Sequence, residues 1–153
     1  MNESKVSTAD CDLILRLYDL RRETEMRKAR NWFASEFWPR SFEDVQRLFM
    51  DFTKPENAWF RQVLTYWDMA CALVAHGGLH SGLFNETNHE AYFVYAKIKP
   101  FVAQIRTTFN NPEFLANLER VAESTPEGRE RLGRLQQNLA RWAEMRSSAQ
   151  KAH

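Results

Sequence analysis

The sequence has few cysteines and lacks the common cofactor-binding and catalytic motifs by which many small domains are identified. Its 153 residues include only two cysteines, Cys11 and Cys71, which lie sixty positions apart and form no CxxC pair. A disulfide framework or a zinc finger therefore has no support. The sequence also lacks a GxGxxG motif, a Walker loop, a GxSxG elbow and the paired ExxH motifs of di-iron bundles. These absences lower the expectation of an enzyme and leave no cofactor to predict.

Long apolar runs and an imbalance of charge are missing as well. No window approaches the run of roughly 18 apolar residues that a membrane span needs, and Met1 to Asp12 lacks the apolar centre of a secretion signal. The formal net charge is +1, with 27% charged residues, so the total charge does not indicate a nucleic-acid binder. We expect one soluble, cytoplasmic domain over residues 1–153, with frayed ends at 1–8 and 148–153 and no membrane partner.

Glycine and proline, five of each, fall mostly at the edges of periodic apolar segments, where helices begin and end. The pattern predicts an all-α bundle of about six helices, with a long N-terminal helix that stops before Pro39. Its centre is an antiparallel hairpin of roughly 56–76 and 88–109, whose first helix ends at a left-handed Gly77 or Gly78. The predicted helix starts are Ser7 with Asp10, Ser41 with Asp44, Thr87 with Glu90, Asn111 with Pro112, and Thr125 with Pro126.

The N-terminal helix does not fit this pattern along its whole length. From Arg21 to Asn31 only Met26 and Ala29 are apolar, so the helix either breaks there or projects past the body. The apolar stripe before this segment then has two interpretations. It folds back on the last helix of its own chain, or it is the interface of a homo-oligomer. Its members are Leu13, Ile14, Leu17 and Leu20.

Polar residues on the two hairpin helices form the first candidate site. Arg61 and Asp68 lie two turns apart beside the apolar stripe of the first hairpin helix, and a charge buried there needs a partner. An antiparallel register brings residues of the second helix within range, so a polar, ligand-binding pocket is one interpretation of the pair. The alternative is a set of salt bridges and hydroxyl bonds that only lock the hairpin. The candidate ligand-binding residues are Arg61, Trp67, Asp68, Tyr92, Tyr95 and Lys99.

Histidines and carboxylates around the loop after Val74 form the second candidate site. Imidazole and carboxylate groups together are a usable ligand set for zinc or a similar metal. The two glycines between the first two histidines end the helix, however, so no HExxH-like geometry can form. The alternative is a set of ordinary surface histidines. The candidate metal ligands are His76, His80, His89 and Glu90, with Glu86 nearby.

The start of the last predicted helix is basic. Arg129, Arg131 and Arg134 follow one another closely, but Glu127 and Glu130 interrupt the run. Nucleic-acid binding would favour basic residues on one face with aromatic residues among them. A solvated helix face explains this pattern better, and we expect no nucleic-acid partner.

Four stretches resemble a known family. They read LYDLRRETEMRKARNWF from Leu17, FWPRSFEDV from Phe37, WFRQVLTYWDMACALVAHGGLHSGLF from Trp59 and EAYFVYAKIKPFVAQIR from Glu90. They are similar to a family of uncharacterised, all-helical bacterial proteins catalogued as a domain of unknown function. The resemblance implies an all-helical fold and a bacterial source, and it brings no activity, ligand or catalytic residue.

Three functions remain open at this stage. The first is a non-enzymatic interaction or regulatory module that forms a homo-oligomer through the N-terminal helix. The second is a helical bundle that binds a small molecule or a lipid between the hairpin helices. The third is a metal-assisted enzyme at the loop after Val74. The sequence favours the first of these and identifies no protein partner.

Overall fold

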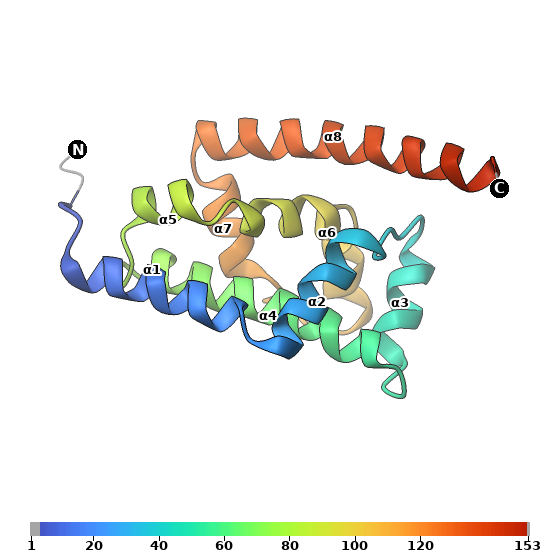
Figure 1. The fold of residues 1–153 in the computed structure, drawn as a ribbon, viewed down its shortest axis with the longest axis horizontal. Coiled ribbons are helices and arrows are strands. Elements are labelled where there is room, and N and C mark those ends of the chain that lie inside the picture. Colours follow the sequence, from blue (N-terminus) through green and yellow to red (C-terminus); the bar gives the residue numbers. More distant parts are fainter. Residues whose placement is uncertain (1–3, 153) are drawn as a thin grey trace.

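The computed structural model describes residues 4–152, which form α-helices and no strand. Figure 1 shows a layered helical body in which the start of α1 and the end of α8 lie far apart, with α8 as a long rod along one side. The all-α prediction is confirmed. The eight helices of the described residues are α1 (Thr8–Arg21), α2 (Thr24–Ser35), α3 (Phe42–Met50), α4 (Pro55–Ala75), α5 (Ser81–Thr87), α6 (His89–Thr108), α7 (Ala116–Glu123) and α8 (Pro126–Lys151).

The long N-terminal helix that the sequence predicts is two helices in the structure, because α1 ends at Arg21 and α2 begins at Thr24. The Glu23 carboxylate accepts the backbone N–H groups of Glu25 (3.1 Å) and Met26 (3.0 Å), so it caps a new helix. The break turns α2 so that its few apolar residues face inward. Met26 and Ala29 are buried there, together with Trp32 and Phe33 further along the helix.

The second additional helix is α5, which occupies the loop expected between the hairpin helices. His80 begins it by accepting the Leu83 N–H at Nδ1 (3.1 Å). The expected start of the next helix at Thr87 is wrong, because the Thr87 hydroxyl donates to the Leu83 carbonyl (2.7 Å) within α5. Helix α6 begins instead after Asn88.

The start expected at Asn111 and Pro112 is also displaced, since α7 begins at Ala116. The residue before it, Leu115, has a left-handed backbone (φ +54°) and offers no side-chain cap. Other predicted signals are confirmed. Ser7 and Asp10 form a reciprocal capping box, and the Thr125 hydroxyl accepts the Gly128 N–H (3.0 Å) at the start of α8.

Helix α4 is the centre of the packing. It contacts α2 and α7 most extensively, whereas α6 is covered mainly by α8; α4 and α6 also touch each other. The largest fully buried side chains include Trp67, Tyr95, Phe33, Phe60 and Phe84. Burying each such side chain contributes about 1.5–3 kcal/mol, so the aromatic residues of α2, α4, α5 and α6 supply much of the stabilisation.

The predicted fraying of the chain ends can be compared with the structure only within residues 4–152. The fraying expected at 1–8 and 148–153 includes residues 1–3 and 153, which lie outside the described residues, while α8 stays helical to Lys151. Within residues 4–152, no helix combines the length and apolarity needed to cross a bilayer.

Gly77 closes α4 in a left-handed conformation, at φ +76°. The Gly78 N–H donates to the Leu73 carbonyl (2.8 Å), and Leu79 is buried beside this turn.

We predict that Gly77→Ala lowers the free energy of unfolding by about 1 kcal/mol, because a Cβ disfavours positive φ. Urea denaturation measures the change. Gly78→Ala is the matched control, and an equal loss in both variants would contradict the explanation.

Candidate functional site

The apolar stripe of α1 is largely covered by the protein's own fold. Leu17 is 3% exposed, and Leu13 and Ile14 are partly buried against the core. Leu20 alone of the four is well exposed, at 49%. Helix α1 contacts α2 and α5 more than it contacts the last helix, and the Leu17 carbonyl accepts a hydrogen bond from Tyr66 of α4.

The candidate metal ligands are not brought together. His76 ends α4, His80 begins α5 and His89 begins α6. The His80 Nδ1 is occupied by the Leu83 N–H, and Glu90 is paired with Arg30. No group of three or more His, Cys, Asp or Glu side chains within residues 4–152 is arranged to hold a metal ion.

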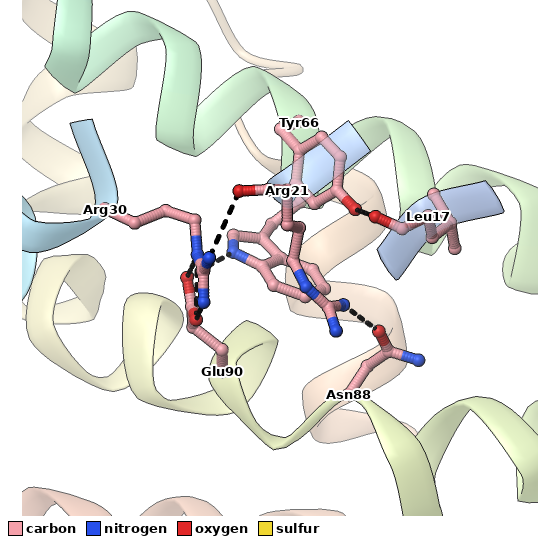
Figure 2. A network of polar contacts seen from close by, with 7 residues as sticks. Leu17, Arg21, Arg30, Tyr66, Asn88 and Glu90 are labelled. Carbon is pink, nitrogen blue, oxygen red and sulfur yellow. Dashed lines mark hydrogen bonds and ion pairs between the residues drawn. The ribbon is translucent and has the colours of Figure 1, made fainter. Parts of the chain in front are cut away.

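Glu90 instead belongs to a polar network between α1, α2, α4 and α6, which Figure 2 shows. Arg30 donates to the Glu90 carboxylate through Nε (2.8 Å to Oε1) and Nη2 (2.6 Å to Oε2), and the Trp67 indole N–H lies 3.4 Å from Oε1. Arg30 Nη1 also donates to the Arg21 carbonyl (3.2 Å), at the end of α1. The hydrogen bond to Glu90 raises the pKa of Arg30 above its ordinary value.

The same network fixes the end of α1. The Arg21 guanidinium lies over the Trp67 ring, 5.2 Å from its centroid, and donates to the Asn88 side chain. The Tyr66 hydroxyl donates to the Leu17 carbonyl, and burial raises the pKa of Tyr66 to about 12. Trp67 is therefore covered by Arg21 and is not the floor of an open pocket.

Of the three candidates on α6, Tyr92 and Lys99 contact side chains of neighbouring helices, and Tyr95 is buried. The Tyr92 hydroxyl donates to Asn85 (3.0 Å), and the Arg131 guanidinium of α8 lies 4.6 Å from the Tyr92 ring centroid. Lys99 forms an ion pair with Glu123 of α7. Tyr95 is 1% exposed, and this burial raises the pKa of its hydroxyl. These residues do not share a pocket with Arg61.

Arg61 and Asp68, in contrast, do share one. A groove of about 400 Å³ runs along α4, between the end of α3 and the segment 111–115. Its lining is mostly apolar, with polar groups at a few points. The lining residues are Phe49, Phe60, Arg61, Leu64, Thr65, Asp68, Met69, Asn111, Glu113, Phe114 and Leu115.

Asp68 holds the far wall of this groove in place. Its carboxylate accepts the backbone N–H groups of Asn117 (3.1 Å) and Leu118 (2.9 Å), and also the Asn117 side-chain amide (3.1 Å). These are the first N–H groups of α7, which Leu115 cannot cap. Asp68 therefore caps α7 from another helix and positions the wall formed by 111–115.

Arg61 lies at the rim with part of its guanidinium available. Its Nε donates to Asn57 Oδ1 (3.0 Å), and the buried Asn57 amide donates to the carbonyls of Leu48 and Phe49. Among residues 4–152, no hydrogen bond from its Nη atoms accompanies this contact. The Phe52 ring, 71% exposed, lies 5.6 Å from the guanidinium carbon.

Comparisons with known proteins give a family but no activity. A family model described as "Domain of unknown function (DUF4760)" matches residues 6–125. The chain belongs to this family. The family domain includes α1 to α7, and hence the whole groove and the Arg30–Glu90 network, whereas α8 lies beyond the match. No curated protein and no solved structure matches the chain.

We predict that Asp68→Ala lowers the free energy of unfolding by about 1–3 kcal/mol, because it leaves the first N–H groups of α7 without an acceptor. Asp68→Asn keeps one acceptor oxygen and should lose less. Thermal and urea denaturation of the two variants check this order. Wild-type stability in Asp68→Ala would contradict the capping role.

Proposed function

We propose that the domain binds a small amphipathic anion, an acyl chain or aromatic ring that carries a carboxylate, in the groove along α4. The observation that carries the proposal is the available Arg61 guanidinium at the rim of an apolar groove of about 400 Å³. This volume falls within the range of about 300–1,000 Å³ that is typical of small-molecule sites.

The chemistry of the lining selects the ligand class. Phe49, Phe60, Leu64 and Phe114 offer an apolar surface to a chain or ring. Arg61 offers two terminal nitrogens in the planar arrangement that matches a carboxylate. Asp68 does not compete for Arg61, because its oxygens accept hydrogen bonds from α7.

We predict that octanoate binds more tightly than 1-octanol, which has the same chain and no charge. Arg61→Gln should remove this preference and weaken octanoate binding by about ten- to a hundredfold, since a hydrogen bond to a charged group contributes roughly 1.5–3 kcal/mol. Isothermal titration calorimetry on the full chain measures both ligands. An unchanged preference in Arg61→Gln would reject Arg61 as the anion contact.

A second pair of variants tests the groove itself. Thr65→Trp places a large ring in the groove and should abolish binding. Thr107→Trp is the matched control, because Thr107 is also an exposed helical threonine whose hydroxyl donates to a carbonyl four residues back. Equal binding in the two variants would locate the ligand elsewhere.

Self-association is a second candidate function, favoured by the exposed apolar side chains near the end of α8. Trp142 (44% exposed) and Met145 (69% exposed) lie three residues apart, on one face of the helix. Burial of such a pair against a second copy of the chain would remove apolar surface from water.

We predict for this function a dimer in light scattering across a hundredfold range of concentration. The double variant Trp142→Ser, Met145→Ser should give the monomer mass, because it removes the apolar contact. Met50→Ser, at a similarly exposed methionine outside α8, should leave the dimer intact. A wild-type monomer throughout the range would reject self-association.

A further inference from the structure

Lys97 is a buried lysine in the middle of α6, 6% exposed. Its amine donates to the carbonyls of Phe33 (2.6 Å) and Ala34 (3.3 Å), at the C-terminal end of α2. Four aromatic rings surround the nitrogen. Their centroids lie 4.0 Å away for Trp38, 5.4 Å for Phe33 and Phe93, and 5.8 Å for Phe37.

A pocket of about 260 Å³ opens beside this lysine, between α6, α8 and the turn at Trp38 and Pro39. It shares no lining residue with the groove along α4. Gln136 is the one uncharged polar side chain in the lining, and no described residue contributes a carboxylate to it. The remaining lining residues are Trp38, Pro39, Ala96, Lys97, Pro100, Phe101, Leu139, Ala140 and Ala143.

The surroundings of Lys97 make its amine unlike those of exposed lysines. Burial lowers the pKa of Lys97 to about 7, and the positive charge of Arg146 on α8 acts in the same direction. The aromatic faces and the carbonyls of α2 act in the opposite direction, because they favour the cation. With a pKa of about 7, both the cation and the neutral amine are populated near neutral pH. An ordinary lysine at pH 7 is neutral in only about one molecule in 3,000. The neutral amine keeps both carbonyl hydrogen bonds and has a lone pair left for reaction.

We propose that Lys97 is a covalent attachment site, at which the amine forms an imine with a small apolar aldehyde that enters the pocket between α6 and α8. The nitrogen lone pair attacks the carbonyl carbon, a C–N bond forms, and the carbonyl π electrons move to oxygen. Two protons move from nitrogen to that oxygen, which leaves as water, and a C=N bond remains. The step needs no oxidant or reductant. The proposal is independent of ligand binding along α4.

The test is reductive trapping of the folded, full-length chain with benzaldehyde and cyanoborohydride. The modified chain is then digested, and its peptides are mapped by mass spectrometry. Peptide mapping separates Lys97 from the other lysines and from the α-amino group. At pH 7 we expect at least about tenfold more modification at Lys97 than at Lys28, whose pKa is raised by its hydrogen bond to Glu25. Modification of Lys97 should be half-maximal near pH 7 in a series from about pH 6 to about pH 10.

Two outcomes would overturn the proposal. One is an unmodified Lys97 under conditions in which Lys28 reacts. The other is a pH profile for Lys97 that parallels that of Lys28. Neither outcome requires a variant at Lys97, so the result does not depend on whether such a variant folds.

A matched pair of variants on α8 tests entry through the pocket. Ala140→Trp fills the pocket and should lower the modification of Lys97 several-fold. Ala149→Trp, at an exposed alanine of the same helix that does not line the pocket, should leave it unchanged. Equal modification in both variants and in the wild type would reject this pocket as the aldehyde site.

Discussion

The cap that Asp68 provides for α7 is the interaction on which the candidate site depends. Helix α7 starts after a left-handed Leu115, and its own sequence offers no side chain to accept its first N–H groups. The Asp68 carboxylate accepts two of them from the facing helix. Without this cap, α7 would lose its hydrogen bonds to α4, and the segment 111–115 would be held mainly from α6, where Arg106 donates to the Phe114 carbonyl (3.0 and 2.8 Å). The Asp68 carboxylate therefore affects both the packing of α4 against α7 and the shape of the groove along α4.

The opposite flank of α4 depends on a charged group as well. Trp67 lies next to Asp68 in sequence but contacts Arg21 and Glu90, and Glu90 is paired with Arg30. A partly buried pair of this kind is costly to disrupt, because removal of one charge leaves the other without compensation. The network also explains how the polar segment after α1 can pack: Arg30 finds its partner on α6, not within its own helix.

The parts of the fold that could be predicted depend on contacts local in sequence. Ser7, Gly77 and Thr125 act on backbone groups within a few residues, so short patterns predicted their roles. The caps at Glu23 and His80 were missed because neither residue type is a common cap signal. In the candidate site, the sequence grouped Arg61 and Asp68 with Tyr92, Tyr95 and Lys99. Arg61 and Asp68 line the same groove, whereas the three residues of α6 do not line it, because side-chain direction around α6 depends on tertiary packing. For the same reason, the sequence did not predict that Lys97 is buried.

The most direct test of the central claim is an NMR titration of the uniformly ¹⁵N-labelled chain with octanoate, which locates a bound ligand residue by residue. A ligand in the groove should shift the backbone amide signals of α4 from Arg61 to Met69 and of the segment 111–115, while the distant end of α8 stays unchanged. Shifts confined to α8 and the Pro100 region, or no saturable shift at all, would contradict the assignment of the groove along α4 as the binding site.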